Sequence, residues 1–248
     1  MNILVCVSQV PDTTTKVAVG ADGKTIDKAG VKFILNPYDE FTIEEGLRLR
    51  EKFGGSVTAL TVGGDGAKEI LRTALAMGVD KAIIVKDDNR EDSFSVATNI
   101  AEAAKTIQPD VVILGRQSID YDSFGMASMV GELLDMPSIS VVSKWSIEGT
   151  TVTAERDIEG GKEVVSTTLP CVISAQKGLN DPRYPKLPDI MKAKSKPIEE
   201  RAGIASASRT QTVSMELPLS KRVGKILGDS DADISELVRL LHEDAKVI

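Results

Sequence analysis

The sequence of 248 residues contains one histidine, His242, and two cysteines, Cys6 and Cys171. A Ser-His-Asp or Cys-His catalytic site would have to use His242, which falls in a helix-like segment with acidic neighbours. Both cysteines lie inside apolar runs, which is typical of buried thiols in a reducing compartment and not of a disulfide framework. We therefore expect neither a catalytic residue nor a metal site in this chain.

Long apolar runs and an excess of positive charge are also missing. No run approaches the roughly 20 apolar residues of a membrane helix, and the N-terminus has no basic region of the kind that opens a signal peptide. The net charge of -7 argues against general nucleic-acid binding. We expect a cytoplasmic protein, or a mitochondrial matrix protein if the source is eukaryotic, that binds no nucleic acid and does not insert into a membrane.

Apolar, mostly β-branched runs alternate with segments of helical period over the first half of the chain. This rhythm predicts an α/β fold with a doubly wound, mostly parallel sheet covered by helices on both faces. The predicted strands are residues 3–7, 57–62, 81–85 and 111–114, and the predicted helices are 39–53, 67–77, 93–105 and 124–134.

The pattern changes after residue 138, where turn residues separate strand-like runs. We predict an antiparallel extension of the sheet by residues 141–147, 151–158, 163–169 and 171–175. An Asp-Gly pair at residues 22–23 predicts a hairpin between residues 16–19 and 25–26.

Residues 1–194 form the predicted nucleotide-binding domain, and residues 195–248 form a linker and a C-terminal arm. The linker, 195–212, is rich in small and polar residues, and a short strand is predicted at 212–217. An amphipathic helix is predicted at 233–243, capped by Asp231 or Asp233. Its apolar stripe either folds back on this domain or packs on another chain.

Three polar or Gly-rich segments follow predicted strands, where ligands bind in open α/β sheets. They are residues 63–66, residues 115–123 and residues 36–39. Glycines and helix N-termini favour phosphate groups, so these segments together predict a nucleotide pocket, although each one alone is compatible with an ordinary turn. The sequence contains neither G-x-G-x-x-G nor G-x-x-x-x-G-K-[ST], so the prediction rests on no dinucleotide fingerprint or P-loop.

Residues 178–196, GLNDPRYPKLPDIMKAKSK, combine three prolines with apolar side chains and a basic flank. Because proline fixes φ, such a segment is partly ordered before it binds and loses less entropy on docking. The pattern suits contact with another protein, whereas composition alone favours an ordinary surface connection followed by a solvated helix.

Three further motifs accompany the Pro-rich segment: residues 36–40 (NPYDE), 71–78 (LRTALAMG) and 115–120 (GRQSID). With these motifs in this order, the sequence resembles the electron transfer flavoprotein beta subunits. The resemblance covers residues 1 to about 200 and implies an adenine-nucleotide alpha-hydrolase-like fold.

The resemblance implies two cofactors: a structural AMP, and an FAD shared with an alpha subunit that holds most of it. In electron-bifurcating relatives a second FAD takes the place of AMP. The implied cofactor-binding residues are Cys6, Asn36, Pro37, Tyr38, Asp39, Val62, Gly63, Gly115, Arg116, Gln117, Ser118, Ile119, Asp120, Asp122, Ser123, Gly125 and Met126. The family often has Asn, a variable residue, Thr and Gly where this chain has residues 124–127, FGMA.

The resemblance also implies partners. An alpha subunit completes the heterodimer, acyl-CoA dehydrogenases supply electrons, and a quinone oxidoreductase receives them. Residues 178–191 correspond to the family's recognition loop, with Leu187 as its anchor. The implied docking residues are Tyr184, Leu187, Pro188, Ile190 and Met191. Asp157 corresponds to an acid, usually Glu, that helps to free the mobile flavin domain.

Two other functional classes remain open at this point. An adenylating or ATP-hydrolysing enzyme would need a Gly-rich loop after the first strand, where residues 8–12 read SQVPD. A stand-alone adenine-nucleotide sensor would explain the α/β domain and leave residues 178–196 and the C-terminal arm without a role.

Overall fold

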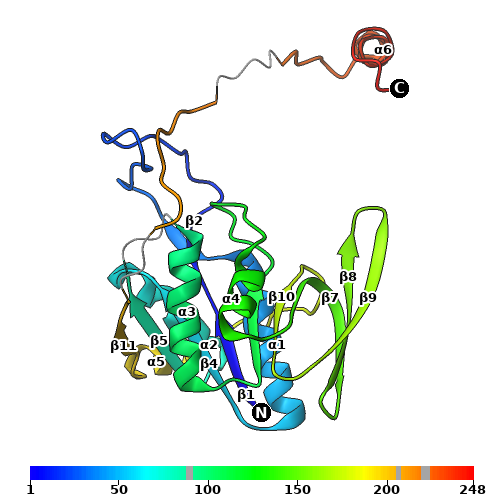
Figure 1. Ribbon diagram of the computed structural model, residues 1–248. Helices are drawn as coiled ribbons and strands as arrows, with labels where there is room; N and C mark the ends of the chain where they lie inside the picture. The colour runs from blue at the N-terminus through cyan, green and yellow to red at the C-terminus, as the bar shows by residue number, and fades with distance from the viewer. Residues whose placement is uncertain (88–91, 205–207, 219–223) are drawn as a thin grey trace.

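The computed structural model describes residues 1–87, 92–204, 208–218 and 224–248. Within these residues, a nine-stranded sheet in the order β11-β5-β4-β1-β6-β10-β7-β8-β9 forms the centre of the molecule (Figure 1). Its strands are β1 (Asn2–Cys6), β4 (Ser56–Val62), β5 (Lys81–Lys86), β6 (Val111–Gly115), β7 (Ser138–Glu148), β8 (Thr151–Ile158), β9 (Gly161–Thr168), β10 (Cys171–Ala175) and β11 (Glu199–Ala202).

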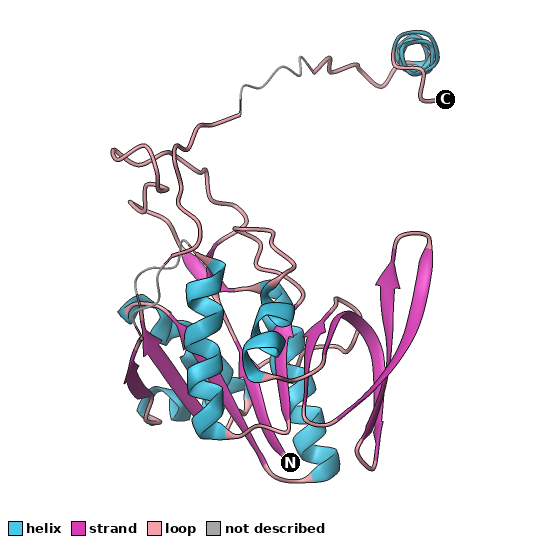
Figure 2. Ribbon diagram, viewed as in Figure 1, coloured by secondary structure: helices cyan, strands magenta, loops and turns pink. Residues whose placement is uncertain are grey.

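Helices cover both faces of the sheet, as the alternation predicted (Figure 2). On β1, Ile3 and Val5 face the core shared with α1 and α2, whereas Leu4 and Cys6 face the core shared with α3 and α4. The helices are α1 (Pro37–Phe53), α2 (Lys68–Met77) after the 3-10 turn η1 (Asp65–Ala67), α3 (Ser93–Ile107), α4 (Met126–Leu134), α5 (Leu187–Ser195) and α6 (Asp231–Arg239), which continues into the π-helical turn η2 (Leu240–Asp244).

The chain reverses direction across the sheet at β1. It winds outward from β1 to β4 and β5 and then returns through α3 to β6, on the other side of β1. The connections that follow β1 and β4 therefore run to one face of the sheet, and the connection that follows β6 runs to the other face. In sheets of this kind a crevice opens at the carboxyl ends of such strands.

The local sequence explains why α1 starts and ends where it does. Pro37 stands in the first turn with Asp39 nearby, and Gly54 ends the helix with φ of 72°. The middle of α1 lies close to the sheet, because a Cβ at Gly46 would be 2.7 Å from Cγ1 of Val5. This close packing holds the start of α1 beside the end of β1.

Beyond β10 the sheet becomes antiparallel, and one of the four strands predicted there runs differently. β7, β8 and β9 pair antiparallel, whereas β10 pairs parallel with both β6 and β7. The prediction of four antiparallel strands was therefore wrong for β10. All five of its residues are buried, as expected for a parallel strand between two others.

The predicted hairpin on the first crossover is present in a short form, with backbone hydrogen bonds between residues 18–20 and 25–27. A single antiparallel bridge joins Val19 to Ile26, and two short strands, β2 (Gln9–Pro11) and β3 (Phe33–Leu35), pair at the base of this excursion. Polar side chains and turns fill residues 12–32, so a longer ladder there would bury little apolar surface.

The segment predicted as a linker contains an edge strand. β11 pairs parallel with β5, although its sequence, EERA, has no apolar alternation. Residues 205–207 of the predicted linker lie outside the described residues. The strand predicted at 212–217 is absent from the described residues, which run extended there and donate one backbone hydrogen bond from Met215 to Gly23.

The C-terminal helix is present and begins earlier than predicted. Ser230 is its N-cap and accepts a hydrogen bond from the Asp233 backbone, so the prediction of Asp231 or Asp233 as the cap was wrong. Its apolar residues Ile234, Leu237 and Val238 are exposed, and α6 lies apart from the sheet (Figure 1).

Candidate nucleotide pocket and docking segment

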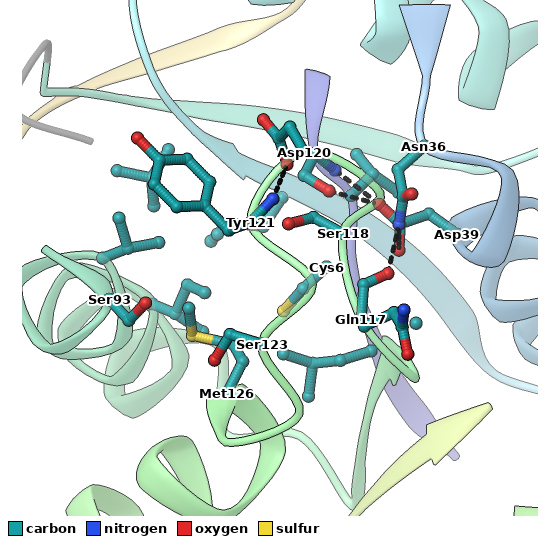
Figure 3. Close-up of a pocket in the computed structure, with 18 residues that line it drawn as sticks. Cys6, Asn36, Asp39, Ser93, Gln117, Ser118, Asp120, Tyr121, Ser123 and Met126 are labelled. Carbon is teal, nitrogen blue, oxygen red and sulfur yellow. Dashed lines mark hydrogen bonds between the residues drawn. The ribbon is translucent and has the colours of Figure 1, made fainter. Parts of the chain in front are cut away.

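A pocket opens at the carboxyl ends of β1, β4 and β6 (Figure 3). The space between its walls is about 810 Å³, which includes space that is open to solvent. Its lining residues are Cys6, Val7, Ser8, Asn36, Asp39, Leu60, Val62, Ser93, Val96, Ile100, Leu114, Gly115, Gln117, Ser118, Asp120, Tyr121, Ser123 and Met126.

Different elements supply the two sides of the pocket. Cys6 lies at its floor at the end of β1, and the loop after β6 brings Ser118 and Asp120 along one wall (Figure 3). Ser93 at the start of α3 and Met126 at the start of α4 face them from the other side. Because burial raises the pKa of Cys6 above its ordinary value, this thiol is neutral and apolar in character.

Asp39 is a buried carboxylate beside the pocket and the centre of a hydrogen-bond network. Its Oδ2 accepts from the backbone N and the Oγ of Ser8, each at 2.7 Å, and its Oδ1 accepts from Nδ2 of Asn36 at 3.0 Å. Burial raises the pKa of Asp39 to about 7, and hydrogen bonds from Ser8, Asn36 and the Gly115 backbone offset part of that rise.

The approach of the β6 end to this carboxylate requires glycine at position 115. A Cβ there would lie 2.2 Å from Oδ1 of Asp39 and 2.9 Å from Cβ of Tyr38. Gly115 therefore lets the loop after β6 start directly against the first turn of α1, so that the two polar segments predicted from the sequence share one site.

Two buried acceptors at the pocket accept no hydrogen bond from the residues that the structure describes. Nδ2 of Asn36 donates to Asp39 and to the Gln117 carbonyl at 2.9 Å, which fixes the amide and leaves its Oδ1 without a hydrogen-bond partner among the described residues. Oε1 of Gln117 is also buried and has no hydrogen-bond partner among the described residues. Asn36 is only 1% exposed, so a ligand with N–H or O–H donors would satisfy a group that is costly to leave unpaired.

Arg116 turns away from the pocket and stacks on aromatic rings. Its guanidinium lies 4.5 Å from the centre of the Phe124 ring and 6.0 Å from that of Tyr38. Its Nη1 also donates to Oε1 of Gln176 at 3.3 Å. Phe124 therefore contacts the guanidinium, at the position where the sequence departs from the family pattern.

The Gly-rich turn after β4 lies outside the pocket lining and is neutralised by its own ion pairs. Asp65 contacts the ammonium groups of Lys68, at 2.7 Å, and of Lys86, and Lys68 also contacts Glu200 at 2.6 Å. The hydrogen bonds from these lysines lower the pKa of Asp65 to about 2. The acidic side chain of Asp65 already occupies the turn that leads into α2. This removes the reason to expect a phosphate at the N-terminus of α2.

The structure gathers most of the predicted cofactor residues at one place and separates others. Those that line the pocket are Cys6, Asn36, Asp39, Val62, Gly115, Gln117, Ser118, Asp120, Ser123 and Met126. Those outside the lining are Pro37, Tyr38, Gly63, Arg116, Ile119, Asp122 and Gly125. Most of this second group are close in sequence to a lining residue and shape its backbone. Asp122 does so with φ of 53° and a backbone hydrogen bond to Ser118.

Sequence reasoning missed part of the lining. Ser8 follows β1 directly, so its position at a strand end was a usable signal. Ser93, Val96 and Ile100 come from α3, and only the crossover that carries α3 back over β1 brings them here. Tyr121 also lines the pocket, although it was not among the residues of its loop that were predicted to bind the cofactor.

The Pro-rich segment exposes apolar side chains on the surface opposite α3 and α4. Tyr184 is 92% exposed and Leu187 is 72% exposed, and Ile190 and Met191 are exposed beside them. Leu187 begins α5, a helix with Pro188 in its first turn that packs on α2 (Figure 1). The segment is a surface connection followed by a mostly exposed helix, the arrangement that composition alone favoured, and contact with another protein stays a prediction.

The sequence is similar along its whole length to electron transfer flavoprotein beta subunits. The model of the electron transfer flavoprotein domain matches residues 23–205. The beta subunit from Bacillus subtilis (strain 168) is 43% identical, with 100% of each chain covered. This chain belongs to the electron transfer flavoprotein beta subunit family. A mitochondrial beta subunit from Oryza sativa subsp. japonica is 38% identical with full coverage of both, and the Homo sapiens beta subunit is 36% identical over 90% of this chain and 91% of its own.

Family membership confirms the resemblance found in the motifs, and the fold agrees with the predicted α/β class. Asp157 on β8, for which the resemblance implies a conformational role, accepts from Oγ of Ser143 at 3.1 Å and from Nε2 of Gln176 at 3.5 Å. It therefore joins two strands of the antiparallel extension, β7 and β8, to the start of the segment that leads to α5.

The described residues contain neither a candidate membrane-spanning helix nor a candidate metal-binding cluster. None of the helices there is both long enough and apolar enough to span a bilayer. Nor do three His, Cys, Asp or Glu side chains come together there in a way that could bind a metal ion.

Proposed function

We propose that this chain is the small subunit of a heterodimeric electron transfer flavoprotein. In this proposal it binds a structural AMP, covers one edge of an FAD held mainly by the alpha subunit, and docks the electron donors. Acyl-CoA dehydrogenases reduce the complex, and a quinone oxidoreductase receives the electrons. We assign this work to the cytoplasm, or to the mitochondrial matrix of a eukaryote. FAD supplies the redox chemistry when bound, and this chain supplies binding and orientation.

The observation that carries the AMP proposal is a pair of buried acceptors without a partner among the described residues, Oδ1 of Asn36 and Oε1 of Gln117. Adenosine offers an exocyclic amine and ribose hydroxyls as donors to such groups. The phosphate would be held at the N-terminus of α4, where Ser123 and the backbone after Gly125 face the pocket and no side chain caps the helix among the described residues. Asp120 would accept from ribose hydroxyls, away from the phosphate.

The docking proposal rests on the exposed apolar group of Tyr184, Leu187, Ile190 and Met191. A leucine that is mostly exposed in a segment held by prolines can enter an apolar pocket of a partner at little entropic cost. Lys186, Lys192 and Lys194 surround it and favour a partner with an acidic rim. Tyr38 is half-buried beside the pocket, and we assign it to the FAD edge.

The proposal is tested by electron transfer to the complex. The chain is co-expressed with an alpha subunit, and bleaching of the flavin absorbance is followed after addition of an acyl-CoA dehydrogenase and octanoyl-CoA. We expect rapid bleaching, and a higher KM for the complex when Leu187→Ala is introduced. Because Leu187 is exposed, its truncation leaves folding intact, and Val213→Ala is a matched exposed control. A flavin that stays oxidised with an active dehydrogenase would refute the proposed function.

A further inference from the structure

The chain just before the docking residues is fastened to two buried carboxylates of α1. Glu44 is 5% exposed and Glu45 is 7% exposed, although both are charged residues on the outer side of a helix. They are buried because the segment after β10 lies over them. A carboxylate in such a position is stable only when charged or N–H donors satisfy it, so each needs a specific partner.

Arg183 is the partner of Glu44. Its Nε and Nη2 donate to the two oxygens of Glu44 at 2.8 and 2.9 Å, and its backbone N donates to Oε2 at 3.1 Å. Its Nη1 also donates to Glu51 at 2.7 Å. This two-pronged geometry sets both the position and the direction of the arginine. These hydrogen bonds raise the pKa of Arg183 and lower that of Glu51.

Asn180 is the partner that the segment after β10 provides for Glu45, and Arg48 on α1 also forms an ion pair with Oε2 of Glu45 at 3.7 Å. Its Nδ2 donates to Oε2 of Glu45 at 2.8 Å and to the Phe41 carbonyl at 2.9 Å. The other oxygen of Glu45 accepts from Nε1 of Trp145 on β7 at 2.7 Å. The first fixed point of the segment therefore consists of two side chains, Asn180 and Arg183, held on one helix.

A second fixed point follows the docking residues. Nη1 of Arg72 on α2 donates to the carbonyl of Ala193 at 2.7 Å and also to that of Lys196, at the end of α5. Nζ of Lys196 donates to the Val79 carbonyl at 3.3 Å. Tyr184, Leu187, Ile190 and Met191 lie between the two fixed points and are themselves exposed.

We propose that Arg183 and Asn180 are positioning residues that hold residues 184–191 in their docking conformation by binding Glu44 and Glu45. This inference rests on the proposed docking function. Burying two carboxylates contributes little net stability compared with apolar side chains of the same size, whereas it fixes one register of the chain. A segment ordered before binding loses less entropy when its apolar group meets a partner. This clamp, formed by Arg183 and Asn180 with Glu44 and Glu45, therefore strengthens docking without touching the partner.

The test compares Arg183→Gln with Arg50→Gln in the complex with the alpha subunit. Arg50 is on the same helix as the clamp's carboxylates, is also partly exposed, and binds Gly78 and Asp80 instead of the docking segment. Hydrogen exchange is measured at the amides of Asp189 and Ile190, which donate to the Lys186 carbonyl. We expect exchange about tenfold faster in Arg183→Gln only, and an intermediate rate in Arg183→Lys, which keeps the charge and loses the two-pronged contact.

The second readout is the KM of an acyl-CoA dehydrogenase, saturated with octanoyl-CoA, for the complex as electron acceptor. We expect KM to rise about tenfold in Arg183→Gln with kcat unchanged, because a conformational cost before binding weakens apparent affinity. Unchanged exchange in Arg183→Gln overturns the inference, and so does faster exchange with an unchanged KM.

Leu187→Ala separates this inference from the proposed function. It is expected to raise KM while leaving the exchange of Asp189 and Ile190 as in the wild type. If Leu187→Ala does not change KM, the docking function proposed for this segment fails, and the positioning role fails with it. If Leu187→Ala raises KM and Arg183→Gln does not, only the positioning role fails.

Discussion

The buried carboxyl of Asp39 gives the stability of this protein a specific dependence on pH. Burial raises its pKa from 3.8 to about 7 in the folded state. At roughly 1.4 kcal/mol for each pKa unit, this difference corresponds to about 4 kcal/mol between the two protonation states. A carboxyl with a raised folded pKa binds its proton more tightly when folded. Its contribution to stability is therefore complete below pH 3.8 and is lost as the pH rises to about 7.

The measurement is urea unfolding followed by Trp145 fluorescence and far-UV circular dichroism, from pH 5 to pH 8, on the wild type and Asp39→Asn. The variant loses hydrogen bonds from Ser8 and is less stable at every pH. The informative quantity is therefore how the difference in unfolding free energy between wild type and variant changes with pH. We expect the free energy of unfolding of the wild type, minus that of the variant, to fall by about 1 kcal/mol per pH unit up to pH 7 and then to level off. A difference that grows with pH would refute this reasoning, because it would mean that the hydrogen bonds to the ionised carboxylate outweigh its burial.

Two further predictions concern the loop after β6 and the base of the C-terminal arm. Gly115→Ala is expected to lower the free energy of unfolding in urea by about 1–3 kcal/mol, because the new Cβ would overlap Asp39 and Tyr38. The control is Gly161→Ala, where a Cβ meets nothing within 4 Å, and it is expected to change stability little. Equal losses in the two variants would refute the close approach at Gly115. Asp92→Ala removes the N-cap of α3 and the acceptor for the Arg209 backbone and the Thr210 hydroxyl, so we expect a loss of about 1 kcal/mol and faster proteolysis at residues 208–210. Ser230→Ala, which removes the cap of α6, is the control, and unchanged proteolysis in Asp92→Ala would show that Asp92 does not hold the arm.

The parallel core could be predicted because its strands and helices differ clearly in period. β1, β4, β5 and β6 are short apolar runs separated by amphipathic helices, and their predicted bounds differ from the observed ones by at most one residue at each end. β10 was placed correctly along the chain and given the wrong direction, since its position beside antiparallel runs outweighed the signal of a wholly apolar, fully buried strand.

Elements whose stability comes from a distant partner could not be read from local sequence. β11 is charged and exposed, and it is a strand only because the edge of β5 offers hydrogen bonds. The same limit applies to the pocket. The strand-end residues were predicted, whereas the wall from α3 depends on a crossover that brings distant residues together. The clamp of Glu44 by Arg183 joins residues 139 positions apart, with no motif to announce it.

The central claim, a nucleotide-stabilised small subunit of an electron-carrying heterodimer, is tested most directly by nucleotide content. The chain is co-expressed with a candidate alpha subunit, the complex is purified, and its nucleotides are released by denaturation and quantified by chromatography. The account predicts FAD and AMP in equal amounts. Twice as much FAD and no AMP would contradict the structural AMP and indicate an electron-bifurcating subunit. A chain that stays alone and releases ATP or ADP would contradict the electron-transfer function itself.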